Sequence, residues 1–261
     1  MQTVFHSADG PLHRLHPLTK LSATVLIVLA AYLLPGSFPP VILLLVVLLL
    51  AILGRSAGWL IKTIAIAMLP IVISIFLIQG VFFPPAHATP IAIGPLTLTI
   101  EGLRLAFVLS TRLLTFSAAI LLLLRTTHPA DLVAALTERG LPRSIGYILL
   151  VSLQIAPDMI ARAGAIQDAQ RSRGMEIDGL FNRLRALPAL VGPLIVGALA
   201  DSEERAMALE SRAFLSPGPK TSWRQLQDSS AQNILRLMLL LTIVGLIIAR
   251  VTILRDTRGF L

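Results

Sequence analysis

The sequence predicts an all-α membrane protein with about five transmembrane helices and a cytoplasmic coupling region of amphipathic helices. Hydrophobic residues make up 55% of the 261 positions and charged residues only 14%, and mean hydropathy is +0.82, whereas a soluble domain of this length would carry far more charge. The apolar runs are long, unbroken and rich in Leu, Ile, Val and Ala rather than alternating. Because lipid offers no partner for backbone N–H and C=O groups, such runs are expected to form helices.

Composition also excludes several classes of function. The chain has no cysteine, which removes disulfides, thiol catalysis and cysteine metal ligands together. Its net charge of +8 could suggest nucleic acid, but in a membrane protein basic residues hold cytoplasmic loops in place and meet anionic headgroups. No RNA-binding aromatic motif or zinc-finger spacing accompanies the charge, so we expect no nucleic-acid partner.

Five apolar runs come close to the length of about 20 residues that a helix needs to span a membrane. They cover residues 18–34, 38–53, 60–83, 103–124 and 234–249. Pro70 lies inside the third run and predicts a kink. These runs divide the chain into N-terminal transmembrane helices (1–124), cytoplasmic coupling helices (125–228), and a C-terminal transmembrane helix with its tail (229–261).

Positive residues orient the predicted spans, because they are retained on the cytoplasmic side. Arg14 and Lys20 flank the first span, and Arg55 and Lys62 lie around the second turn, whereas residues 84–100 carry no Lys or Arg. This alternation places the N-terminus and everything after the fourth span in the cytoplasm. One observation disagrees: five spans put three C-terminal arginines outside, so either that tail is tolerated there or one span is miscounted. The tail arginines are Arg250, Arg255 and Arg258.

Residues 125–228 differ from the spans, because they hold more than half of the 22 basic residues. Charged faces recur at helical spacing, which is typical of amphipathic helices at a membrane surface. His128-Pro129 is typical of a helix start, and Gly140 of the end of the same helix. The apolar patches at 144–155 and 186–199 are short, and prolines are expected to interrupt or bound them. These prolines are Pro157, Pro188 and Pro193.

Two segments of this region share a pattern, in which a small residue precedes an arginine, and a small and then a large apolar residue follow it. Each segment is expected to end a helix that begins near a proline. The first ending is Ser172-Arg173-Gly174, supported by Ala169, Gln170 and Arg171; the second is Ser211-Arg212-Ala213, supported by Ala208 and Glu210.

Helix capping explains either ending alone, since a basic residue meets the negative end of the helix dipole and glycine takes the left-handed turn. The occurrence of two copies weakens that interpretation. Small residues beside Arg173 and Arg212 leave each guanidinium free of steric cover, so it can form a bidentate bond to a partner's carboxylate or carbonyl groups. The pair therefore predicts two protruding arginine side chains that bind in grooves on another protein.

Other polar residues give weaker signals. No Gly-Lys-Ser/Thr phosphate loop is present, so the chain is not expected to hydrolyse ATP itself. A histidine cluster near the N-terminus lacks carboxylates at ligand spacing, which favours helix-start or interfacial roles over a metal site. It consists of His6, His13 and His16. In one interpretation, Arg104 and Arg112 line a polar cavity. In the other, Arg104 lies at the outer membrane interface and Arg112 packs against another helix. Glu101 is expected to be a capping acid.

Three stretches together resemble the transmembrane (T) component of energy-coupling factor (ECF) transporters, the EcfT/CbiQ-like family of vitamin and metal-ion importers. The resemblance covers nearly the whole chain, and its signature is specific as a pair. The first stretch comprises Ser7, Pro11-Leu12-His13-Arg14-Leu15, Pro17 and Thr19-Lys20-Leu21; the second, Leu141-Pro142-Arg143 and the Pro157 helix through Ala169-Gln170-Arg171-Ser172-Arg173-Gly174; the third, Ala206-Met207-Ala208-Leu209-Glu210-Ser211-Arg212-Ala213-Phe214.

The resemblance implies a non-catalytic subunit in the cell membrane of a prokaryote, without a cofactor of its own. Its partners would be two cytoplasmic ABC ATPases, which bind ATP and receive one arginine each, and a separate substrate-binding membrane (S) subunit. The family's triplet is Ala-Arg-Gly; here Ser replaces Ala twice and Ala213 replaces Gly. Since alanine suits a left-handed turn poorly, the second helix is expected to end differently or to fit its groove less tightly.

The residues by themselves do not exclude two other classes of protein. A membrane enzyme acting on lipid-linked substrates would need paired carboxylates or a His/Asp set near the interface, whereas the acidic residues here stand singly on amphipathic faces. They are Asp131, Glu138, Asp158, Asp168 and Glu176. A self-contained secondary transporter would show inverted repeats with broken spans, and the repeat seen here lies in the region predicted to be cytoplasmic.

Overall fold

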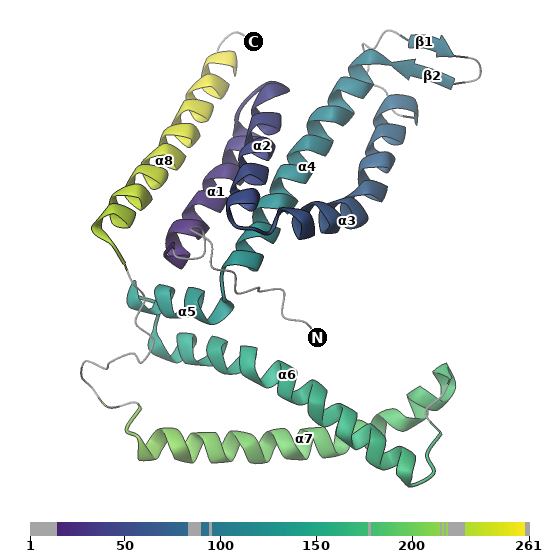
Figure 1. Ribbon diagram of the computed structural model, residues 1–261, viewed down its shortest axis with the longest axis vertical. Coiled ribbons are helices and arrows are strands. Elements are labelled where there is room, and N and C mark those ends of the chain that lie inside the picture. The colour runs from purple at the N-terminus through teal and green to yellow at the C-terminus, as the bar shows by residue number, and fades with distance from the viewer. Residues whose placement is uncertain are drawn as a thin grey trace. The chain divides into compact units, whose positions relative to one another are not determined.

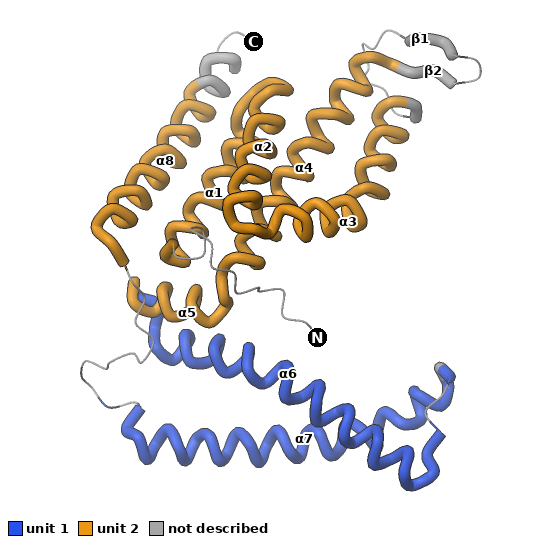
Figure 2. The backbone as a smooth tube through the Cα atoms, in the orientation of Figure 1, with its two compact units in different colours: residues 1, 140–225 blue, residues 2–139, 226–261 orange. Residues whose placement is uncertain are grey.

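The fold is that of a computed structural model, which describes residues 15–82, 90–93, 96–176, 179–214, 216, 218 and 228–258 (Figure 1). The predicted features at Ser7, at 11–14 and at His6 lie outside these residues. The chain divides into two compact units (Figure 2): residues 140–225 form one, and residues 2–139 together with 226–261 form the other.

The larger unit is a bundle of helices. Its helices are α1 (Pro17–Leu33), α2 (Phe38–Leu53), α3 (Ala57–Leu77), α4 (Ile100–Thr126), α5 (Pro129–Glu138) and α8 (Ser230–Arg258). A π-helical turn, η1 (Ile78–Phe82), and a two-stranded antiparallel hairpin, β1 (Pro90–Ile93) with β2 (Leu96–Thr99), join α3 to α4. The hairpin was not predicted, but the helical architecture was and is confirmed.

Helix α4 is the centre of the bundle, since α1, α2 and α3 all pack against it. Its buried face consists largely of small residues, which let helix backbones approach closely, as is usual in membrane proteins. The Thr115 hydroxyl is fully buried and donates to the Pro40 carbonyl of α2 at 3.0 Å. The buried positions of α4 are Gly102, Ala106, Ser110, Thr111, Thr115, Ser117, Ala118, Ala119, Leu122 and Thr126.

Helices α1 and α5 begin with the same His-Pro pair. The Nδ1 atom of His16 accepts from the Leu18 N–H at 3.3 Å, and that of His128 accepts from the Ala130 N–H at 3.2 Å. Each proline occupies a first-turn position, where a missing N–H costs nothing. The predicted helix start at His128 is therefore confirmed, as is the end of α5 before Gly140. His16 takes the helix-start role, one of the two roles expected for the histidine cluster.

The smaller unit consists chiefly of two long helices, α6 (Arg143–Ser172) and α7 (Leu180–Ser211). The prolines that interrupt or bound the apolar patches do not end helices, because Pro157 lies inside α6 and Pro188 and Pro193 lie inside α7. A proline removes one backbone hydrogen bond and bends a helix without ending it when the flanking turns continue. Helix α6 does begin after a proline, Pro142, whereas α7 begins after Gly179.

Five helices of the described chain are long and apolar enough to cross a membrane. They span Ala57–Gly80, Ile100–Thr126, Arg143–Ser172, Phe181–Ser211 and Ser230–Thr252. The predicted third, fourth and last spans are among them. The predicted first two form α1 and α2, of 17 and 16 residues, which are shorter. Helices α6 and α7 meet the same criterion of length and composition, although the prolines inside them made both helices look short in the sequence.

Candidate coupling site at the ends of α6 and α7

The first predicted ending forms a Schellman motif at the C-terminus of α6. Arg173 is the C-cap, with φ of −86°, and Gly174 follows with φ of +84°. The Met175 N–H donates to the Gln170 carbonyl at 3.1 Å, and the Gly174 N–H donates to the Arg171 carbonyl at 2.9 Å. This pair of bonds satisfies carbonyl groups that the helix end would otherwise leave without partners.

The second ending forms the same motif at the C-terminus of α7. Arg212 is the C-cap, with φ of −91°. The Phe214 N–H donates to the Leu209 carbonyl at 3.0 Å, and the Ala213 N–H donates to the Glu210 carbonyl at 2.9 Å. Ala213 adopts the left-handed conformation despite its side chain, with φ of +50°. The expectation that this helix ends differently is therefore wrong: the hydrogen bonds outweigh a conformational cost of about 1–2 kcal/mol.

Both endings expose the arginine within a surface of small residues. Arg173 and Arg212 are exposed, and so are Ala169 and Ala208, which lie one helical turn earlier. The two serines that precede the arginines are satisfied within their own helices. Their hydroxyl groups donate to carbonyls of their own helices at 3.0 Å, Ser172 to Asp168 and Ser211 to Ala208. Of the other supporting residues, Arg171 and Glu210 are exposed and Gln170 is half-buried.

The two arginines lie at opposite ends of the helix pair. Phe214, two residues after Arg212, stacks at a tilt on Tyr147 near the start of α6, with ring centroids 5.2 Å apart. Arg173 is 26 residues further along α6, so at a rise of 1.5 Å per residue the two arginines are separated by about 40 Å. Figure 1 shows α6 and α7 crossing, with their C-terminal ends pointing to opposite sides.

An ion pair joins α6 and α7 where they cross. The Arg162 guanidinium of α6 lies 2.9 Å from the Asp201 carboxylate of α7. Gly197 makes room for it, since a Cβ atom there would lie 2.6 Å from an Arg162 nitrogen. Arg162 precedes Arg173 by 11 residues, and Asp201 precedes Arg212 by 11, so the same length of helix separates the ion pair from each arginine ending. The pairing of Arg162 with Asp201 was not predicted, although each residue lies 11 positions before the arginine of its helix ending.

The remaining candidate residues have structural roles where they are described. Arg112 follows the packing alternative: its guanidinium donates to the Leu34 carbonyl at the end of α1 at 3.4 Å and lies over the Tyr32 ring. Arg104 is exposed, and Glu101 lies in the first turn of α4 as expected. His13 lies outside the described residues, within which no group of three or more metal-ligating side chains occurs.

Comparison with known proteins agrees with these features. Residues 9–223 match the CbiQ family, described as cobalt transport protein. The energy-coupling factor transporter transmembrane protein EcfT of Heliobacterium modesticaldum is 32% identical over 228 residues, which cover 84% of this chain and 85% of the relative. EcfT of Thermosediminibacter oceani is 27% identical over 257 residues, covering 93% and 94%. A Bifidobacterium longum protein named as an ABC transporter ATP-binding protein is 26% identical over 260 residues, or 92% of this chain and 33% of its own length.

The family match extends over both arginine endings and over all helices before α8. This match confirms the family resemblance that the two arginine endings indicated. Together with the five long apolar helices it shows a multi-pass membrane protein. The chain therefore belongs to the CbiQ family of cobalt transport proteins, and it is a non-catalytic component of a membrane transporter rather than an enzyme.

Proposed function

We propose that this chain is the coupling subunit of an ECF-type ABC importer. Two cytoplasmic ATPases bind its two arginine endings, and a separate substrate-binding membrane subunit binds elsewhere on the chain and carries the vitamin or metal ion. The ATPases bind the nucleotide, so the chain itself needs no cofactor. Its task is to transmit the ATP-driven movement of the ATPases to the substrate-binding subunit.

The observation that carries this proposal is the identity of the two helix ends. Two Schellman motifs present Arg173 and Arg212 in the same local geometry, at opposite ends of one helix pair. A single capped arginine needs no explanation beyond the helix dipole. Two matched, exposed guanidinium groups about 40 Å apart fit two copies of one kind of groove better, because a fixed fork of donors suits a groove lined with carboxylate or carbonyl groups.

The crossing of α6 and α7 provides a means of transmission. The Arg162–Asp201 ion pair lies at equal distance from both tips. When ATP draws the two ATPases together, the tips are displaced relative to one another and the angle between the helices changes at this ion pair. Both helices expose large apolar side chains along their length, among them Ile148, Ile160, Ile195 and Leu199. This apolar surface can pass the movement to a membrane partner.

This function assigns the spans to α1–α4 and α8, with the N-terminus in the cytoplasm and α6 and α7 at the cytoplasmic surface. Loop charges support the orientation, since basic residues alternate between successive loops. The start of α1 and the end of α4 also lie at one end of the bundle, because the Lys20 ammonium donates to the Thr126 carbonyl at 2.8 Å. Mid-helix charges in α6 and α7, such as Asp158 and Glu203, suit an interfacial position better than a lipid-facing one.

The named relatives support the same assignment. Two of them are named as transmembrane proteins of energy-coupling factor transporters. The Bifidobacterium longum protein is named for ATP binding, and this chain matches 33% of its length. A segment like this chain therefore occurs there on a longer polypeptide that is named for the partner activity proposed here.

Charge reversal at the two endings tests the docking proposal. The tagged chain is co-expressed with its ATPases and purified in a mild detergent, with Arg173→Glu, with Arg212→Glu and with both. Losing a charged pair in a groove costs about 3–5 kcal/mol, which corresponds to more than about 100-fold in affinity. We expect each single variant to lose one ATPase contact, and the double variant to lose both ATPases.

The matched control is Arg185→Glu, which makes the same charge change at an exposed arginine of α7 that belongs to neither ending. It should retain the ATPases. ATPases that stay bound to the double variant, with transport intact, would falsify the docking role. Uptake by the chain alone in liposomes without ATP would instead identify a secondary transporter.

A further inference from the structure

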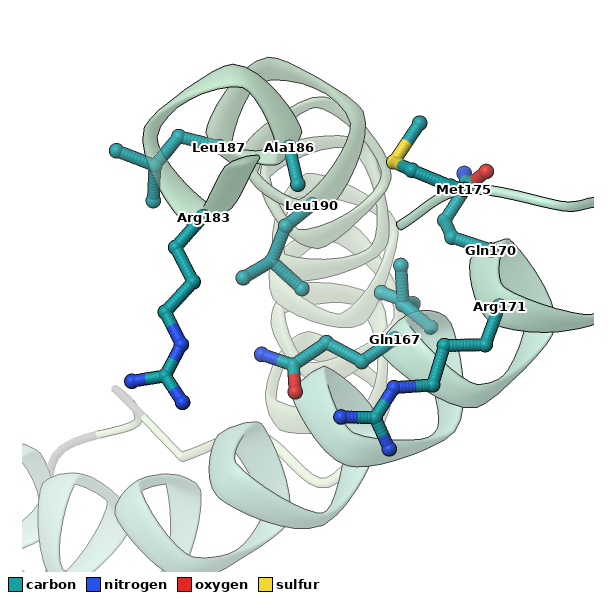
Figure 3. A pocket seen from close by; sticks show the side chains of 9 residues that line it. Gln167, Gln170, Arg171, Met175, Arg183, Ala186, Leu187 and Leu190 are labelled. Atoms are coloured by element: carbon teal, nitrogen blue, oxygen red, sulfur yellow. The ribbon is translucent and has the colours of Figure 1, made fainter. Parts of the chain in front are cut away.

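A pocket of about 340 Å³ lies between the C-terminal half of α6 and the first turns of α7 (Figure 3). Its polar wall includes Arg171 and Gln167 from α6 and Arg183 from α7. Its apolar wall includes Ile166, Leu187 and Leu190. Basic groups from two different helices thus meet an apolar surface in one cavity, and the ATPase-docking role given to the arginine endings does not require it.

The two guanidinium groups of this pocket have no acidic partner among the described side chains. Figure 3 shows Gln167 between the side chains of Arg171 and Arg183, whose guanidinium groups end on the same side of the pocket. Within the described residues, neither arginine forms an ion pair or a side-chain hydrogen bond. Two positive groups that line one pocket repel one another, and a phosphate bound between them offers bidentate bonds to both.

The surroundings favour an anion that carries a hydrocarbon chain. Phe181 and Leu184, in the same first turns of α7 as Arg183, are 75% and 60% exposed. Both helices are apolar enough to enter a membrane. An acidic peptide would engage the arginines but leave the apolar wall and these neighbouring side chains uncovered. A phospholipid covers all three, with its phosphate at the arginines and its acyl chain along the apolar wall.

We propose that the pocket between α6 and α7 is a binding site for an anionic phospholipid. The phosphate lies between Arg171 and Arg183, beside the Gln167 amide. The first part of one acyl chain covers Leu187 and Leu190. A lipid bound in this way ties the α6 ending to the start of α7 through a membrane component, so the headgroup composition of the membrane affects how α6 and α7 are held together.

Native mass spectrometry of the full-length chain in detergent tests this site. Delipidated protein is titrated with phosphatidylglycerol, with phosphatidylcholine and with inorganic phosphate. Arg183→Gln removes one guanidinium, and Arg185→Gln makes the same change at an exposed arginine of α7 that does not line the pocket. We expect the first variant to bind phosphatidylglycerol about tenfold more weakly, as the loss of a charge-assisted hydrogen bond predicts. The second should bind it like the wild type, and phosphatidylcholine should bind weakly throughout.

Four results would overturn the proposal. If the wild type and Arg183→Gln bind phosphatidylglycerol with equal affinity, the pocket is not the binding site. If both variants lose affinity equally, the lipid is held only by general attraction to positive charge. Displacement of the lipid by millimolar inorganic phosphate assigns the site to a free anion. Loss of the ATPases from Arg183→Gln, with lipid affinity unchanged, assigns it to a protein segment. Because Arg173 and Arg212 are intact in these variants, failure of this proposal leaves the docking test unaffected.

Discussion

At the scale of single residues, Ala213 shows how backbone hydrogen bonds override a local preference. It holds φ of +50°, where an L-residue with a side chain is strained and glycine is not. The neighbouring bonds from Phe214 to Leu209 and from Ala213 to Glu210 close the helix end all the same. Gly174, at the same place in the other ending, adopts φ of +84° without that strain.

Replacing Ala213 by glycine should therefore stabilise the end of α7 by about 1 kcal/mol. The local measurement is hydrogen exchange of the Phe214 amide, which donates to the Leu209 carbonyl and should exchange about fivefold more slowly. Ala208→Gly is the control, because the same change inside the helix costs about 1 kcal/mol and should speed exchange. Faster exchange in Ala213→Gly would contradict the strain argument.

At the scale of elements, the crossing of α6 and α7 depends on one ion pair of two partly exposed side chains. Arg162 and Asp201 keep 36% and 34% of their side-chain surface exposed, so the pair contributes only about 0.5–1 kcal/mol to stability. Arg162→Asp and Asp201→Arg each place like charges at the crossing, and the double exchange restores opposite charges. We expect ATP-driven uptake to fall several-fold in each single variant and to recover in the double variant. Uptake and ATP hydrolysis are measured together in proteoliposomes, and no recovery in the double variant would show that the ion pair does not couple the helices.

The same elements show what the sequence could and could not predict. The arginine endings and the His128-Pro129 start were predictable because capping depends on a few consecutive residues. The continuity of α6 through Pro157 was not, because a proline lowers local helix stability while packing elsewhere along the helix offsets the loss. The Arg162–Asp201 contact was not predictable for a related reason. It joins residues 39 apart in the chain, and only the crossing of the two helices brings them together.

At the scale of the whole molecule, both chain connections to the smaller unit leave the bundle from one place. Arg139 immediately precedes Gly140, where that unit begins, and Asp228 follows it by three residues. The Arg139 guanidinium lies 3.2 Å from the Asp228 carboxylate, which also accepts from Arg236 of α8 at 2.6 Å. Asn233 accepts from both arginines, at 2.7 and 2.6 Å. We call these four residues the exit clamp, and we expect it to hold the two connections together while the coupling helices move.

The exit clamp predicts a pH dependence with a definite sign. The hydrogen bond from Arg236 holds the pKa of Asp228 below its ordinary value. A carboxyl group whose pKa is lower in the folded protein stabilises it at a pH above its unfolded value of about 4, and the stabilisation is lost as pH falls through the lower folded value. Asp228→Asn should remove this acid-dependent part of thermal stability. Because Asp228 is partly exposed, the cost at neutral pH should be about 1 kcal/mol.

The functional consequence separates the exit clamp from ordinary stability. If it holds the two connections together, Asp228→Asn should leave the ATPases bound and hydrolysing ATP while uptake falls, because movement of the coupling helices is no longer passed to the bundle at a fixed point. Ser230→Ala changes a nearby exposed residue in the first turn of α8, outside the clamp, and serves as the control. Uptake and hydrolysis that fall in the same proportion would indicate a general loss of folded protein and would rule out a separate coupling role for Asp228.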